Sequence, residues 1–204
     1  MLTELPNNKL PRKFYFQSVL TVAKKLLGKV LVKKIGGELY AGRIVEVEAY
    51  DGLIDEASHA FIGKTKRNEV MFKEGGVLYV YFTYGMYFCC NVVTGKKDEG
   101  KAVLIRALEP LEGIKRMGAN RFGKDFLNDK ELLNLTNGPG KICKAFNITG
   151  KENGMDLLGD EIYILYGKNI KDKDIAATKR IGIKKSSELP WRFYINNNPY
   201  ISKK

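Results

Sequence analysis

The chain has 204 residues, 44% of them hydrophobic, which is enough for one globular domain with a sizeable core. Lys and Arg outnumber Asp and Glu by 35 to 23, and the net charge of +12 favours a polyanionic partner such as DNA, RNA or an anionic membrane surface, although a lysine-rich composition alone does not require one. The sequence has no long apolar run, leader pattern or cysteine framework, so we expect a protein of the reducing cytoplasm without a membrane span.

The first periodic segments predict a helix followed by a β-hairpin. Residues 17–28 have apolar side chains at helical spacing, with Ser18 placed to cap the N-terminus and Gly28 to end the helix. Strands are expected at 29–35 and 38–50, because a Gly-Gly pair between them suits a two-residue turn.

A polar stretch and an aromatic hairpin follow. Residues 51–68 lack clear periodicity and are long enough to suspect a functional loop. Residues 75–95 predict two strands around a short turn. Period-two alternation puts Tyr79, Tyr81 and Thr83 on one face before that turn.

The remaining segments mix strands and helices without regular βαβ order. This pattern predicts an α+β fold with a largely antiparallel sheet. We expect one domain over residues 1–204, with residues 1–15 as its least ordered part. The later elements are predicted as a strand at 101–111 ended by Pro110, helical pieces at 110–123 and 130–148, and strands at 160–167 and 191–197.

Two carboxylates in the middle of the second strand are candidates for chemistry. Period two puts Glu46, Glu48 and Tyr50 on one face together with Ile44. The commoner interpretation is a solvated face whose carboxylates pair with lysines. The alternative is a carboxylate held in a pocket as a general base. His59, the only histidine, is more simply a hydrogen-bonded structural group, but its loop could return it to the same site.

The aromatic turn has two interpretations as well. Tyr84 and Met86 flank Gly85 at the tip, where an aromatic side chain can stack on bases or wedge between base pairs. The alternative is a hairpin folded into the core or a protein-interface patch. The positive charge of the chain favours contact with bases. One histidine and unspaced cysteines argue against a zinc site, and no phosphate-binding glycine motif is present.

Several blocks, in order along the chain, resemble the alkylpurine DNA glycosylases of the 3-methyladenine type. The resemblance covers essentially the whole chain, from about Phe16 to about Ser202. Lys66 departs from the pattern, because a proline is expected there, and this affects loop stiffness. The blocks are "RIVEVEAYDG…DEASHAF", "TKRNEVMF", "LYVYFTYGMYFCCN", "VLIRALEPLEG", "GPGKICKAF" and "RIGI…PWRFY".

The resemblance implies a single domain built round a curved antiparallel sheet, with surrounding helices and a protruding aromatic hairpin. It implies a monofunctional hydrolase of base-excision repair that flips alkylated or deaminated purines out of duplex DNA. Water cleaves the N-glycosidic bond and an abasic site remains, without metal or other cofactor. We therefore expect a monomer that binds double-stranded DNA with a damaged purine, in the cytoplasm and at the nucleoid if the source is bacterial.

The resemblance also assigns residues by motif. Glu48 matches the carboxylate that activates water, and Arg106 matches the arginine that helps to hold that water and carboxylate. Asn91 matches the residue that discourages guanine, and Tyr84 matches the tyrosine that fills the gap left by the flipped nucleotide. Residues of the base pocket are matched by Tyr50, His59, Tyr81 and Asn91. Residues that enter the DNA are matched by Tyr84, Met86 and Tyr87.

Other functions stay open at this point. A non-catalytic nucleic-acid-binding module could use the same aromatic and basic surface, but it would not need Glu48, Arg106 and His59 together. A protein-interaction domain with an apolar hairpin is a third candidate, and a family member that binds lesions without cutting is a fourth. The sequence does not rank methylated adenine, hypoxanthine and etheno-adducts as the preferred lesion.

Overall fold

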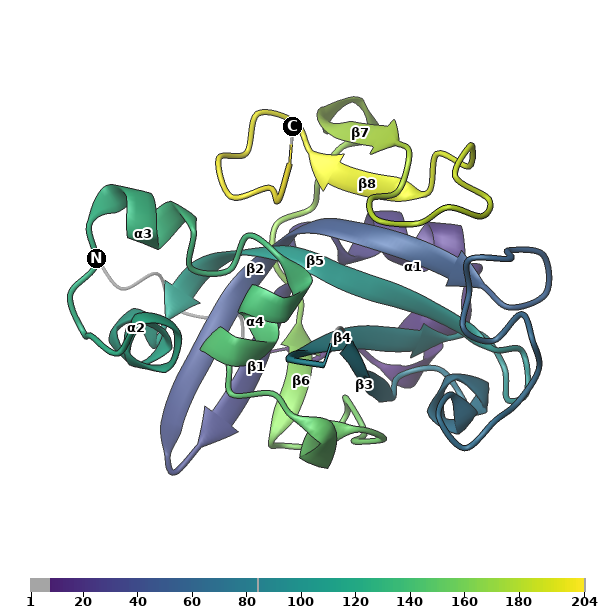
Figure 1. Cartoon of the computed structure of the whole chain (residues 1–204), viewed down its shortest axis with the longest axis horizontal. Coiled ribbons are helices and arrows are strands. Elements are labelled where there is room, and N and C mark those ends of the chain that lie inside the picture. Colours follow the sequence, from purple (N-terminus) through teal and green to yellow (C-terminus); the bar gives the residue numbers. More distant parts are fainter. Residues whose placement is uncertain (1–7, 84, 204) are drawn as a thin grey trace.

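An antiparallel sheet runs through the molecule and carries all the named strands (Figure 1). The computed structural model describes residues 8–83 and 85–203, and the statements below concern these residues. The sheet order is β3-β4-β5-β2-β1-β6, and β8 pairs with both β2 and β7. The strands are β1 (Val30–Ile35), β2 (Glu38–Asp51), β3 (Leu78–Thr83), β4 (Tyr87–Thr94), β5 (Lys101–Glu112), β6 (Ile162–Leu165), β7 (Ile175–Thr178) and β8 (Arg192–Ile195).

The long strand β2 is central to this sheet. β5 lies along one side of it, and β1 and β8 share the other side, β1 along its first half and β8 beside Glu46–Glu48. All these pairings are antiparallel. The predicted α+β class with a curved antiparallel sheet is therefore confirmed, and the sheet forms a single folded unit with its helices.

Short helices cover both faces of the sheet (Figure 1). Helix α1 is the predicted first helix, with the Ser18 hydroxyl accepting from the Thr21 amide at 3.2 Å and Gly28 following in the left-handed region at φ 82°. Buried side chains of α1, the central strands and α4 form the main apolar core. The helices are α1 (Val19–Leu26), α2 (Ile114–Phe122), α3 (Asp129–Leu133) and α4 (Pro139–Ala145), with 3-10 turns η1 (Arg12–Phe16), η2 (Glu69–Phe72), η3 (Gly150–Glu152) and η4 (Asp172–Asp174).

The prediction that Pro110 ends its strand is wrong, because β5 continues to Glu112. Pro110 pairs with Gly42 at a register shift of β2. On its other side, β5 pairs with β4 only over Lys101–Leu104 in the described chain. Proline has no N–H to donate to a neighbouring strand. It is therefore tolerated at a position where one side of its strand has no partner strand.

Two further predictions of elements differ from the structure. The helical piece expected at 130–148 is two helices, α3 and α4, since Pro139 opens the second and disfavours helical geometry at Gly138 before it. The four-residue strand β7 has no counterpart in the predicted elements, because so short a segment carries little periodic signal. Within the described ranges, no helix combines the length and apolar character needed to cross a membrane.

A pair of β-bulges interrupts the alternation between β2 and β5. Ile44 faces Leu108, Glu46 faces Ala107, and Val47 faces Ile105, so Val45 and Arg106 each lack a partner directly opposite. The bulge moves Ile44 into the main core with Val47, so the expectation that Ile44 shares a face with Glu46 is wrong. Bulges re-aim side chains near functional sites, and here the unpaired residue of β5 is Arg106.

Candidate active site

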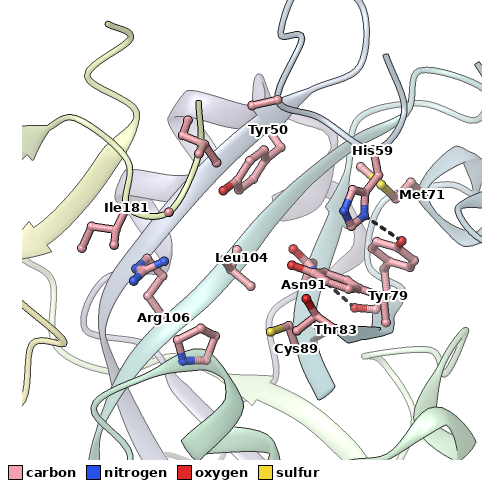
Figure 2. A pocket seen from close by; sticks show the side chains of 15 residues that line it. Tyr50, His59, Met71, Tyr79, Thr83, Cys89, Asn91, Leu104, Arg106 and Ile181 are labelled. Atoms are coloured by element: carbon pink, nitrogen blue, oxygen red, sulfur yellow. Dashed lines mark hydrogen bonds between the residues drawn. The ribbon is translucent and has the colours of Figure 1, made fainter. Parts of the chain in front are cut away.

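A cavity of about 230 Å³ opens over the face of the sheet formed by β2, β3, β4 and β5 (Figure 2). Its volume lies below the ~300–1,000 Å³ usual for sites of drug-sized ligands, which suits a small flat ligand. The residues that enclose it come from eight separate parts of the chain. They are Tyr50, Ala57, His59, Met71, Tyr79, Tyr81, Thr83, Cys89, Asn91, Leu104, Arg106, Pro139, Ile181, Gly182 and Ile183.

Glu48 is fully buried directly behind the wall of this cavity. Its Oε2 accepts from the Tyr50 hydroxyl at 2.8 Å, and its Oε1 accepts from the Ile181 amide at 2.7 Å. The Arg106 guanidinium forms an ion pair with Oε1 at 3.3 Å. All three partners line the cavity although Glu48 does not, so the carboxylate is held against the cavity by residues that border it.

The other carboxylate of β2, Glu46, is also fully buried, but it accepts hydrogen bonds from a different group of partners. Its Oε1 accepts from Arg106 Nε at 3.1 Å and from Arg192 Nε at 2.7 Å. Ser202 adds its amide and hydroxyl, at 2.5 and 2.8 Å from the carboxylate. Glu46 therefore joins β2, β5, β8 and the C-terminal segment, and it orients the arginine that also contacts Glu48. The interpretation of a solvated face paired to lysines is wrong, because both carboxylates are buried and pair with arginines.

Arg106 lies between the two carboxylates at the bulge of β5. Burial disfavours its charge, but Glu48 and Glu46 outweigh burial and raise its pKa. The guanidinium is therefore a permanent cation at the cavity wall, and Figure 2 shows it on the side of the cavity near Ile181.

Behind Tyr50 lies a buried ion pair that the sequence did not reveal. Arg180 and Asp55 are joined by two hydrogen bonds, of 2.5 and 2.8 Å, and both side chains are inaccessible to solvent. The guanidinium carbon lies 4.6 Å from the centre of the Tyr50 ring and 5.5 Å from that of Trp191. Burial and the neighbouring Glu48 raise the pKa of the Tyr50 hydroxyl, so it stays protonated and donates to the carboxylate.

Aromatic rings form the opposite wall. His59 Nδ1 lies 3.1 Å from the Tyr79 hydroxyl (Figure 2). The His59 ring also meets the Tyr81 ring edge-on, with 4.6 Å between centroids. Burial, and to a smaller extent the charge of Arg67, lowers the pKa of His59, so the imidazole is neutral near pH 7. Burial raises the pKa of Tyr79 to about 12. These groups present a neutral aromatic surface to whatever occupies the cavity.

Asn91 and Cys89 complete the wall from β4. Asn91 is buried and donates through Nδ2 to the Tyr79 carbonyl at 3.2 Å. Its amide is thus fixed beside the cavity with one oxygen left to face a ligand. Burial raises the pKa of the Cys89 thiol to about 11, so it is a neutral lining group rather than a nucleophile.

The hairpin of β3 and β4 borders the same cavity through Thr83. Near its tip, Met86 and Tyr87 are exposed, and the Tyr87 ring packs over Gly140 at the start of α4. The predicted wedge Tyr84 lies outside the described residues. The protruding tip therefore stays a prediction.

The structure brings most of the predicted site residues together. Glu48, Arg106, Tyr50, His59, Tyr81 and Asn91 lie at or directly behind one cavity. The sequence did not reveal Asp55, Arg180 or Ile181, nor Arg192 and Ser202, which contact Glu46. Arg180 and Ile181 stand in the block "RIGI", but nothing in that block indicates which side chains turn inward. In the described part of the chain, no group of three or more His, Cys, Asp and Glu residues is placed to hold a metal ion.

Comparison with known proteins matches this chain to one family. The family model described as Methylpurine-DNA glycosylase (MPG) matches residues 13–199. Three relatives, each provisionally named a 3-methyladenine DNA glycosylase, cover nearly all of both sequences. They are proteins of Clostridium novyi (50% identical over 202 residues, 96% of this chain and 99% of the relative), Carboxydothermus hydrogenoformans (52% over 196 residues, 96% and 99%) and Alkaliphilus oremlandii (49% over 202 residues, 96% and 100%).

Proposed function

The chain belongs to the methylpurine-DNA glycosylase family, and we propose that it hydrolyses the N-glycosidic bond of alkylated or deaminated purines flipped out of duplex DNA. As a member of that family it is a DNA glycosylase, a hydrolase of DNA repair. The observation that carries the proposal for the site is the buried Glu48. Tyr50, Ile181 and Arg106 hold it at the wall of an aromatic cavity.

The cavity explains why the target nucleotide must leave the helix. A base inside a duplex cannot reach Glu48, and extrusion costs a few kcal/mol, least for a damaged or mispaired base. The rings of Tyr50, His59 and Tyr81 offer stacking faces and edges to a flat purine. Purines alkylated on the ring carry positive charge, which aromatic rings attract through their quadrupoles.

We assign the bond cleavage to Glu48 acting on water. As the bond between C1′ and the base nitrogen breaks, its electron pair leaves with the base and the sugar becomes an oxocarbenium-like cation. An anionic Glu48 stabilises that charge and takes a proton from the water whose oxygen bonds to C1′. Arg106 orients this carboxylate, and Tyr50 holds its other oxygen.

Two further roles are proposed for β4 and the hairpin tip. Asn91 excludes guanine, because the amide, fixed to the Tyr79 carbonyl, leaves no room for an exocyclic amine. Tyr84, with Met86 and Tyr87 beside it, fills the gap left by the extruded nucleotide and offsets the lost stacking. The partner is double-stranded DNA with a damaged purine, which the protein binds as a monomer in the compartment that holds the chromosome.

A glycosylase assay tests this function. Duplexes with a single hypoxanthine, ethenoadenine or methylated purine are incubated with the protein and a chelator, and abasic sites are then cleaved with alkali. We expect strand breaks only after alkali and none in an undamaged duplex. Breaks without alkali would indicate lyase activity, and tight lesion binding without breaks would indicate a non-catalytic binding module.

A further inference from the structure

The loop that follows β2 carries an exposed surface that the cavity does not use. We call its residues 61–67 the rim loop. Phe61 and Ile62 at its start are 43% and 78% exposed, and every residue from there to Arg67 is exposed. Neighbouring exposed apolar side chains bordered by polar residues are typical of binding surfaces.

The rim loop has a fixed shape. The buried Asn68 donates through Nδ2 to the carbonyls of His59 and Gly63, at 2.7 and 2.9 Å. Its Oδ1 accepts from the Thr65 amide at 2.6 Å. One side chain thus ties two positions within the rim loop to His59 before it, so the exposed side chains are presented on a preformed turn.

Three cations follow the apolar pair. Lys64, Lys66 and Arg67 have no carboxylate within 4.0 Å among residues 8–83 and 85–203. In the neighbouring part of the same loop, Glu56 is paired with Lys185 at 3.3 Å. Lys66, which stands where the family resemblance predicts proline, adds one of the three charges. The surface therefore combines apolar contact with positive charge that is free to meet an anion.

The rim loop lies at the mouth of the catalytic cavity. His59, which lines that cavity, precedes Phe61 by two residues and is bonded to Asn68 through its carbonyl. Arg67 is close enough that its charge acts on both His59 and Tyr79. A duplex that delivers a nucleotide into the cavity must pass this loop as well as the hairpin.

We propose that the rim loop is a second DNA-contacting element, distinct from the hairpin tip. Lys64, Lys66 and Arg67 pair with backbone phosphates beside the flipped nucleotide. Phe61 and Ile62 pack against sugars and base edges in the adjoining groove, as apolar side chains of groove-binding proteins do. The proposal rests on the proposed function, because it takes the position of the duplex from the cavity.

A charge-removal variant tests the phosphate contacts. Lesion-duplex affinity is measured from 50 to 300 mM salt for wild type and for Lys64→Ala/Lys66→Ala/Arg67→Ala. Each phosphate contact contributes about 0.9 to the slope of log K against log salt, so we expect the slope to fall by roughly two to three. The matched control, Lys168→Ala/Lys171→Ala/Lys173→Ala, removes equal charge from the exposed segment that leads into η4 and includes part of it, and it should leave the slope within about 0.5 of wild type.

A second variant tests the apolar contacts. Phe61→Ser/Ile62→Ser should bind the lesion duplex about tenfold more weakly with an unchanged salt slope, since it loses buried apolar area but no charge. Leu53→Ser/Ile54→Ser, exposed in the same loop but before His59, is the matched apolar control.

The outcomes separate the two proposals. If wild type excises the base and both rim-loop variants bind like their controls, the rim-loop proposal is wrong and the function stands. If wild type binds the lesion duplex without excision, the proposed function is wrong, while the binding comparison still decides the rim loop. Retained DNA binding together with self-association lost only in the apolar variant would show that this surface binds a second copy of the chain instead.

Discussion

The backbone amide of Ile181 donates a hydrogen bond of 2.7 Å to Oε1 of Glu48, across 133 residues of chain. The predicted base on β2 is therefore oriented by a segment near the C-terminal end. The contact also distinguishes Glu48 from Glu46, whose partners are Arg106, Arg192 and Ser202.

Glu48→Gln should abolish excision and spare binding. Glutamine keeps the size of the side chain but cannot take a proton or oppose the charge on the sugar, so single-turnover excision should fall by at least ~10²–10⁴-fold. Affinity for the lesion duplex should hold or improve, because an anion near phosphate is removed.

Glu46→Gln is the matched control for that variant. It leaves Arg192 without its carboxylate and Arg106 with Glu48 alone, so the free energy of unfolding should fall by about 3–5 kcal/mol. Excision by the folded fraction should fall far less than for Glu48→Gln. A dead Glu46→Gln beside a near wild-type Glu48→Gln would refute the assignment of the base.

Tyr50→Phe removes the hydroxyl that holds Oε2 of Glu48. A hydrogen bond to a charged group contributes about 1.5–3 kcal/mol, so single-turnover excision should fall roughly 10–100-fold with little change in lesion affinity. Tyr163→Phe, on β6 and away from the cavity, should match wild type. Equal rates for the two variants would show that the hydroxyl does not act on the carboxylate.

Asn91→Ser should admit guanine. The smaller side chain no longer crowds the exocyclic amine, and it releases the bond that fixes Asn91 to the Tyr79 carbonyl. The measurement is excision of guanine opposite thymine, relative to hypoxanthine in the same duplex. No relative gain for the variant would exclude Asn91 as the residue that rejects guanine.

His59→Gln should weaken the dependence of the free energy of unfolding on pH between pH 8 and pH 5. Burial lowers the pKa of His59 in the folded protein below the ordinary value of 6.5. As pH falls through about 6.5, the unfolded chain takes up this proton before the folded one, so wild type loses stability and regains it as pH rises. Because the chain has one histidine, urea unfolding of both proteins from pH 8 to pH 5 isolates the effect. Parallel curves would contradict it.

Asp55→Asn should destabilise the fold more than an exposed pair does. Arg180 would remain buried with an uncompensated charge, which costs about 3–5 kcal/mol. Asp160→Asn breaks the exposed pair with Lys9 and should leave the urea midpoint close to that of wild type, because solvent screens an exposed pair. Urea midpoints that move equally for both variants would show that the buried pair contributes no more to stability than the exposed pair.

The sequence by itself predicted the features that depend on local order. Alternation along β3 placed Tyr79, Tyr81 and Thr83 on one face, and all three line the cavity. The same rule placed Glu48 and Tyr50 side by side, since residues two apart on a strand point the same way. The caps of α1 were readable because capping uses residues a few positions apart.

The tertiary structure decided everything that joins distant segments. Asp55 meets Arg180 across 125 residues, and Ser202 meets Glu46 across 156, and no local period encodes either contact. The paired bulges at Val45 and Arg106 turn the arginine toward both carboxylates, and only the register of β2 against β5 reveals them. A buried ion pair and a solvated one use the same residue types. Glu46 and Glu48 are equally buried, and their partners, which depend on how the whole chain packs, separated the structural Glu46 from the Glu48 at the cavity.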